Sequence, residues 1–137
     1  APGYHPMADG VALEGMRLIA DALPRAYDNG KDIEARADML SAASMGATAF
    51  QKGLGGVHAL AHPIGAIFDT HHGLTNAILL PYVMRANRRA IEGNCETICR
   101  LLGLAAPGFD TLFEWVLAFR TRLGIVNTLA EIGVDVN

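Results

Sequence analysis

Hydrophobic residues recur at helical spacing along almost the whole chain of 137 residues. Between Asp9 and Pro24, for example, apolar side chains return every three or four positions, as they do on one face of an α-helix. No stretch shows the sustained alternation of apolar and polar residues that is typical of a β-strand. The pattern therefore predicts an all-α protein, organised as a helical bundle.

Signals that start and stop helices divide this pattern into segments. Asp9 and Asp110 are expected N-caps, whereas Pro24, Gly103 and Gly124 mark expected ends. The predicted helices run from Asp9 to Pro24, Asp32 to Lys52, His58 to Phe68, His72 to Arg85, Glu92 to Leu102 and Asp110 to Leu123, with a short one from Asn127 or Thr128. The glycines before His58 do not form a phosphate loop, because no strand precedes them and the G-x-G-x-x-G pattern is incomplete.

Composition excludes several classes of protein. Hydrophobic residues make up 51% of the chain and charged residues 18%, so a buried core is expected rather than disorder. No apolar run approaches the roughly 18 residues that span a membrane, and no signal peptide is recognisable, so we expect a cytoplasmic protein without membrane contact. The net charge of −3 argues against a nucleic-acid binder. Cys95 and Cys99, four positions apart on one predicted helix, are expected to be reduced thiols.

Four of the five histidines fall between positions 58 and 72. On a helix, His58 and His62 lie on one face, and a tight loop would bring His72 back towards that face. Neutral imidazole is the commonest side-chain ligand for zinc and similar divalent ions. The residues alone therefore favour a chelating pair of His58 and His62 assisted by His72, with hydrogen-bonded core histidines as the alternative.

The remaining candidates near this cluster are weaker. His71 is expected to be a bystander at the start of a helix, Asp69 a loop or capping residue, and His5 a surface residue. A catalytic metal needs three or four protein ligands, and the segment offers no obvious carboxylate among them. Spacing alone therefore does not complete a metal site.

The stretch "GVHALAHPIGAIFDTHHGLTNAILLPYVMRAN" closely resembles the signature of the iron-containing alcohol dehydrogenases, which belong to the dehydroquinate synthase-like superfamily. Its form is His, three residues, His-x-x-Gly, then a second His-Gly followed by Asn-Ala and Leu-Pro. Segments on both sides, including "DIEARADMLSAASMGATAF" and "LGIVNTLAEIGVD", are similar to the same family. The resemblance covers nearly the whole chain.

This resemblance implies a two-domain enzyme with an N-terminal domain that binds NAD or NADP and a C-terminal all-α domain that binds a metal. The metal is usually iron(II), or else zinc or another divalent ion, and an Asp and three His hold it. Two of these ligands correspond to His58 and His72. His62 corresponds to a histidine beside the substrate and the nicotinamide, with a role in proton handling. The family pattern thus makes His72, rather than His62, the partner of His58.

By the same resemblance, the other two ligands form an Asp-x-x-x-His pair that precedes "GYHPMADG". Residues 1–137 are therefore expected to be part of the C-terminal domain of a dehydroquinate synthase-like fold, without the nucleotide-binding domain. The expected substrate is a small alcohol or aldehyde, the chain alone is expected to be inactive, and uncovered apolar surface favours a homo-oligomer. Two alternatives are a stand-alone helical interaction or metal-binding module without catalysis, and another reductase of the superfamily, such as a maleylacetate reductase.

Overall fold

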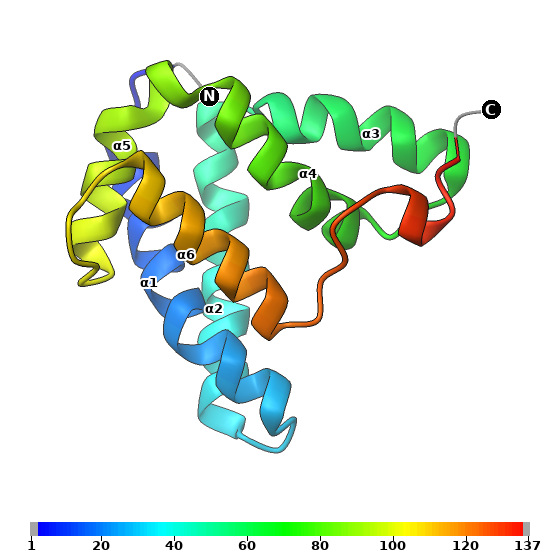
Figure 1. Cartoon of the computed structure of the whole chain (residues 1–137). Coiled ribbons are helices and arrows are strands. Elements are labelled where there is room, and N and C mark those ends of the chain that lie inside the picture. Colours follow the sequence, from blue (N-terminus) through cyan, green and yellow to red (C-terminus); the bar gives the residue numbers. More distant parts are fainter. Residues whose placement is uncertain (1–2, 136–137) are drawn as a thin grey trace. The chain divides into compact units, whose positions relative to one another are not determined.

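The structure, a computed structural model, describes residues 3–135, and within that range it contains helices and no strand (Figure 1). The α-helices are α1 (Pro6–Asp28), α2 (Ile33–Ala49), α3 (Gly56–Phe68), α4 (His72–Ala86), α5 (Arg88–Leu101) and α6 (Phe109–Arg122), and the 3₁₀ helices are η1 (Phe50–Lys52) and η2 (Ala130–Ile132). The prediction of an all-α protein is confirmed. None of the helices in the described part of the chain is both long and apolar enough to span a membrane.

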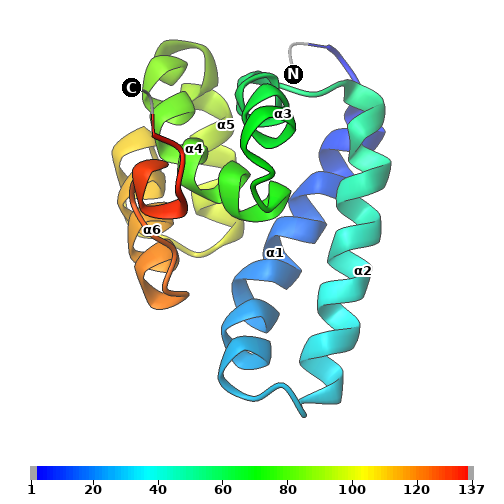
Figure 2. The ribbon, with the colours of Figure 1, turned by 90° about the vertical axis from the view of Figure 1, so that its right-hand side faces the viewer.

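The helices fall into two compact units. The first comprises the residues up to Gly53 together with Arg100–Gly103, and the second comprises Leu54–Cys99 and the residues from Leu104 onwards. In the first unit α1 packs along α2, as Figure 2 shows. Ala22, Ala35 and Ala42 are buried there, and a Cβ atom built on Gly15 would lie 3.4 Å from the Cβ atom of Met45. Small residues therefore let the two helices approach closely.

Helix α1 begins earlier than predicted, at Pro6 instead of after Asp9. The Nδ1 atom of His5 accepts a hydrogen bond from the backbone N–H of Ala8, at 3.1 Å, and so caps the helix. Pro6 follows at the first helical position, where its missing N–H costs nothing and its fixed φ suits the helix. The prediction of Asp9 as N-cap is therefore wrong, and His5 is a partly buried capping residue rather than a simple surface residue.

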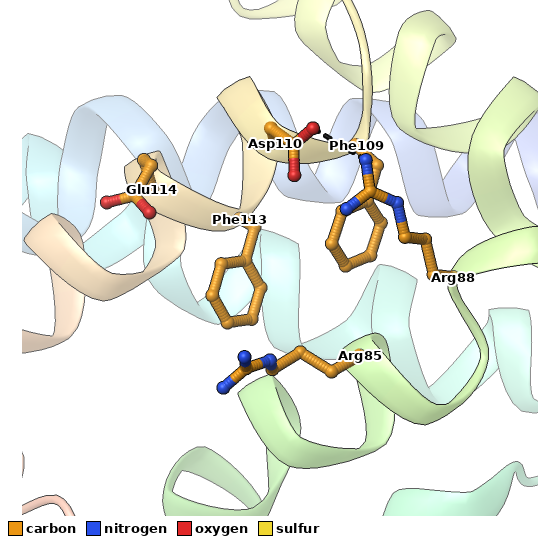
Figure 3. A pocket seen from close by; sticks show the side chains of 6 residues that line it. All are labelled: Arg85, Arg88, Phe109, Asp110, Phe113 and Glu114. Carbon is orange, nitrogen blue, oxygen red and sulfur yellow. Dashed lines mark hydrogen bonds and ion pairs between the residues drawn. The ribbon is translucent and has the colours of Figure 1, made fainter.

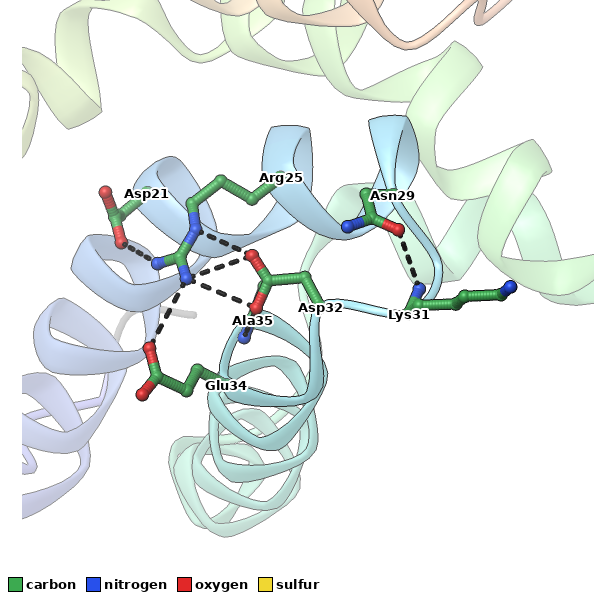
Figure 4. A network of polar contacts seen from close by, with 7 residues as sticks. All are labelled: Asp21, Arg25, Asn29, Lys31, Asp32, Glu34 and Ala35. Atoms are coloured by element: carbon green, nitrogen blue, oxygen red, sulfur yellow. Dashed lines mark hydrogen bonds and ion pairs between the residues drawn. The ribbon is translucent and has the colours of Figure 1, made fainter.

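Pro24 does not end α1, which continues to Asp28. A proline inside a helix removes one backbone hydrogen bond and commonly costs about 3 kcal/mol. Here Arg25 holds the turn beyond the proline: it donates to Asp21 (3.3 Å) and to Asp32 (3.2 Å), and its carbonyl accepts from Asn29 (2.9 Å), as Figure 4 shows for the side chains. These contacts join the last turn of α1 to the start of α2.

Asp32, where the sequence predicts the second helix to start, is the N-cap of α2. Its carboxylate accepts from the backbone N–H of Ala35 at 2.9 Å and pairs with the guanidinium of Arg25 (Figure 4). The Ala35 hydrogen bond, and after it the contact with Arg25, lowers the pKa of the Asp32 carboxyl. The segment predicted to reach Lys52 is α-helical only to Ala49 and ends in the 3₁₀ turn η1.

In the second unit, α4 packs against both α3 and α6. The largest fully buried side chains are Ile78 and Thr75 on α4 and Cys95 and Cys99 on α5. Both cysteines are free thiols, and burial raises the pKa of the Cys95 thiol. The core therefore uses these cysteines as small apolar residues.

Asp110 is not the N-cap of α6, contrary to the prediction. The helix begins at Phe109 after Gly108, and the Phe109 N–H donates to the carboxylate of Glu92 on α5, at 3.1 Å. Asp110 instead lies 2.6 Å from the guanidinium of Arg88. Helix α5 also begins at Arg88 rather than Glu92, because only Asn87 separates it from α4. A side chain from another helix has taken over the capping role, which a local sequence pattern cannot reveal.

We predict that Asp32→Ala lowers the melting temperature more than Asp32→Asn, because asparagine keeps an oxygen that can cap Ala35. The lowered pKa means that the carboxylate stabilises the fold above its unfolded pKa and loses this effect as the pH falls through the folded pKa. Circular dichroism melts at neutral and acidic pH test this: the advantage of the wild type over Asp32→Asn should shrink on acidification. Asp21→Asn, which removes only one exposed partner of Arg25, serves as the control.

Candidate metal centre

Three imidazole rings converge in the second unit. His58 and His62 lie one turn apart on α3, and His72 is the first residue of α4. The ring centroids of His58 and His72 are 5.3 Å apart, those of His62 and His72 5.5 Å, and those of His58 and His62 5.6 Å. The chain reversal that the sequence predicts after Phe68 therefore does bring His72 to the face of α3 that carries the other two rings.

The reversal begins at Asp69, which ends α3 in the left-handed conformation with φ 52°. Its N–H donates to the carbonyl of Gly65 at 3.0 Å. Aspartate enters this region more readily than most residues, because its short polar side chain tolerates the local geometry. Asp69 is thus a capping residue, as the sequence suggested.

The turn is then fixed by side chains at the start of α4. The Nδ1 atom of His71 accepts from the backbone N–H of Leu74 at 3.2 Å, so His71 caps α4. The buried hydroxyl of Thr75 lies 2.8 Å from the hydroxyl of Thr70 and 3.1 Å from the carbonyl of His71. Both contacts are hydrogen bonds if Thr75 donates to the carbonyl and accepts from Thr70. Together they set the direction in which α4, and with it His72, leaves the loop.

Asn76 lies between two of the histidines and was not singled out by the sequence reasoning. Its Nδ2 atom is 3.0 Å from Nε2 of His72 and 3.3 Å from Nε2 of His58. Asn76 follows His72 by one helical turn, so the two side chains share a face of α4. Helical spacing could have placed Asn76 near His72, but only the packing of α3 on α4 brings His58 to the same atom.

Electrostatics favour a neutral ring at His58. Burial lowers the pKa of this imidazole, and the neighbouring rings of His72 and His62 lower it further. A neutral imidazole keeps a lone pair on one ring nitrogen, which is what metal ligation requires. His62 and His72 are more exposed than His58.

The donor set suits a divalent ion in type but is incomplete in number. Two imidazole nitrogens, Nε2 of His58 and of His72, face a common point, and imidazole suits iron, zinc and related ions. Across residues 3–135, however, no group of three or more His, Cys, Asp and Glu side chains is arranged to hold a metal ion. The described residues thus offer part of a ligand set, with His62 close by but not completing it.

Comparison with known proteins decides the family. The model of the "Fe-containing alcohol dehydrogenase family, C-terminal" matches residues 2–137.

The chain belongs to the Fe-containing alcohol dehydrogenase family.

Individual relatives agree with this assignment. The chain is 45% identical over 143 aligned positions to a 4-hydroxybutyrate dehydrogenase of Cupriavidus necator and 36% identical over 141 positions to an NAD-dependent methanol dehydrogenase of Bacillus methanolicus. Each alignment covers 98% of this chain and 37% of the relative. A crystal structure of a 1,3-propanediol oxidoreductase superposes with a TM-score of 0.91 and 31% identity, over 98% of this chain and 37% of that one. The resemblance and the fold class predicted from the sequence are confirmed.

The chain spans little more than a third of the length of these relatives. The comparisons show the family to which the chain belongs. The individual roles of His58, His62 and His72 stay predictions, which the convergence of the rings supports.

A separate surface cavity of about 250 Å³ lies beside the start of α6, and no histidine lines it (Figure 3). The Arg88 guanidinium lies 4.7 Å from the centroid of the Phe109 ring, and that of Arg85 lies 5.7 Å from the Phe113 centroid. Since Arg88 also pairs with Asp110, these contacts tie the ends of α4 and α5 to α6. We interpret the cavity as part of the packing of α4 and α5 against α6.

We predict that Thr75→Val destabilises the fold by about 1 kcal/mol, because valine keeps the shape but removes the hydrogen bonds of the buried Thr75 hydroxyl to Thr70 and to the His71 carbonyl. Thr75→Ser keeps the hydroxyl and should lose less. Urea unfolding gives the free energies. Contacts between the His58 and His72 rings, followed by nuclear Overhauser effects, should weaken in Thr75→Val and persist in Thr75→Ser. Equal contacts in both variants would show that the hydroxyl does not place α4.

Proposed function

We propose that the chain is part of a metal-dependent, NAD(P)-linked alcohol dehydrogenase or aldehyde reductase. The observation that carries the proposal is the convergence of His58 Nε2 and His72 Nε2 on one point, with the His62 ring beside them. The three rings lie together at the surface of the second unit, where a small ligand can reach them. Membership of a family of alcohol dehydrogenases supports the same reaction class.

His58 and His72 are the residues that would hold the ion. Iron(II) is our first choice, with zinc or another divalent ion as the alternative, and imidazole ligands suit each of them. When bound, such an ion supplies Lewis acidity to a substrate oxygen and favours loss of the hydroxyl proton. We propose that the two missing ligands, an Asp and a His, come from outside residues 1–137.

His62 is our candidate for proton transfer. Its ring lies 5.5 Å from that of His72 and 5.6 Å from that of His58, and its side chain is exposed. Oxidation of an alcohol releases a proton from the hydroxyl and a hydride from carbon, so a base near the hydroxyl accelerates it. An exposed imidazole beside the site can take that proton and pass it to solvent.

The hydride acceptor in this proposal is NAD or NADP, held by an N-terminal nucleotide-binding domain that lies outside residues 1–137. The methanol dehydrogenase relative is named as NAD-dependent, which supports NAD as the first choice. A small alcohol or aldehyde is the proposed substrate, in keeping with the named relatives. A homo-oligomer stays our prediction, supported by exposed apolar side chains on α3 such as Leu60 and Ile67.

We predict that His58→Ala and His72→Ala each reduce iron retention and NAD-linked alcohol oxidation about 100-fold or more in the complete protein, since loss of a direct ligand should exceed the 10–100-fold cost of losing an outer-shell partner. His62→Ala should retain the metal and lose turnover instead. His71→Asn is the matched control, because asparagine can still cap α4 and the position is not a proposed ligand. Metal analysis and initial rates separate these outcomes, and full activity in both ligand variants would refute the proposal.

We also predict that a polypeptide limited to residues 1–137 shows no NAD-linked alcohol oxidation, because two imidazoles alone bind metal weakly. The assay supplies iron(II), NAD⁺ and a series of small alcohols, with the complete protein as positive control. Robust turnover by the 137-residue polypeptide would contradict the prediction. Tight zinc binding without turnover would point to a stand-alone metal-binding module.

A further inference from the structure

Only the nitrogen end of the Asn76 amide has hydrogen-bond partners among the described residues. Its Nδ2 atom lies within hydrogen-bonding distance of both His58 Nε2 (3.3 Å) and His72 Nε2 (3.0 Å). Its Oδ1 atom is buried and has no hydrogen-bond partner among the described residues. Buried polar atoms are rarely left without a partner, so one that is needs a reason. The end of the amide that contacts the histidines is therefore the one that carries the two N–H donors.

We propose that Asn76 is a positioning residue whose amide nitrogen lies at the point shared by the two imidazoles. Its amide donates one N–H to His58 and the other to His72, and so holds both rings in the tautomer and orientation that can accept an ion. The inference rests on the proposed function only for the statement that His58 and His72 are ligands.

The tautomer follows from the chemistry of the amide. The –NH₂ group of asparagine has two protons to donate and does not accept hydrogen bonds. Both Nε2 atoms must then be acceptors, so each neutral ring carries its own proton on Nδ1. A ring in this form has its lone pair on Nε2, and both lone pairs point at the same place. The amide therefore selects the form of each histidine that a divalent ion needs.

The reversed amide would have the opposite effect. With Oδ1 between the rings, both histidines would have to donate from Nε2, and the two lone pairs would move to the Nδ1 atoms on the far side of each ring. Neither Nε2 could then bind an ion without losing a proton first. The two orientations of one side chain thus predict opposite proton positions on two histidines, and those positions can be measured.

Ion binding should release the amide. A metal ion that takes both Nε2 lone pairs removes both acceptors of Asn76 at once, so the two hydrogen bonds must break together. Asn76 thus contacts the same ring nitrogens that an ion would use. This differs from the usual arrangement, in which the supporting group holds the other nitrogen of a ligating histidine.

The test is nitrogen-15 NMR of the labelled full chain, freed of metal by a chelator, in mildly alkaline buffer. Long-range proton–nitrogen spectra distinguish a protonated ring nitrogen from one with a lone pair. We expect protonated Nδ1 and unprotonated Nε2 in both His58 and His72, with scalar couplings across both hydrogen bonds to the Asn76 amide. Addition of zinc ion alone should abolish both couplings and shift both Nε2 resonances together. A protonated Nε2 on either ring overturns the proposal.

Variants separate positioning from mere packing. Asn76→Asp keeps the shape but can only accept, so it should move the proton to Nε2 on both rings. Asn76→Leu keeps the approximate volume without hydrogen bonds, so both rings should become mixtures of tautomers. Asn94→Leu, at an exposed position of α5, is the control and should leave the ring spectra unchanged. Unchanged tautomers in Asn76→Asp would refute the proposal, and the wild-type spectrum decides the question even if a variant does not fold.

The measurement is also independent of the dehydrogenase proposal. It is made without substrate, nicotinamide or turnover. If His58→Ala and His72→Ala keep full activity while the predicted tautomers are observed, the enzyme proposal fails and the amide bridge stands. If the tautomers are wrong while both alanine variants lose metal and activity, the inference about Asn76 fails and the enzyme proposal stands.

Discussion

The reversal of the chain between α3 and α4 is the constraint on which the histidine cluster depends. Asp69 takes a left-handed conformation, His71 caps the next helix, and the Thr70–Thr75 contact joins the loop to the first turn of α4. Each of these is a short-range interaction, and each alone is modest. Together they decide that α4 returns along α3 rather than continuing away from it. The approach of His72 to His58 is a consequence of this turn.

The buried face of α4 anchors the arrangement. Thr75, Ile78, Leu79 and Met84 are buried, so one face of α4 is held by apolar contacts while its first residue carries an exposed ring. A site on a helix with a buried face is more precise than a site on a loop, since packing fixes the backbone beneath the ligand. The histidine cluster thus lies on a helix with a buried face, while the rings of His62 and His72 are exposed.

Much of this was predictable from the sequence, because it depends on spacing. Helical periodicity gave the all-α class, and the His58–His62 interval with a loop before His72 gave the cluster. The errors arose where a contact between segments overrides a local signal. Arg25, just beyond Pro24, contacts Asp32 at the start of α2, and Glu92 caps α6 in place of Asp110. Asn76 was missed for a related reason: its partner His58 lies 18 residues away, and no pattern shows which of two amide ends faces a ring.

The short sequence separations within the cluster have a kinetic consequence. Asn76 is 4 residues from His72 and 18 from His58, so every contact in the cluster closes a small loop. Closure of a loop of about ten residues takes on the order of 10–100 ns, and its entropic cost grows only slowly with length. The two-helix hairpin can therefore gather its rings early in folding, before distant segments join. The cluster is therefore a local feature of the chain, confined to residues 58–76.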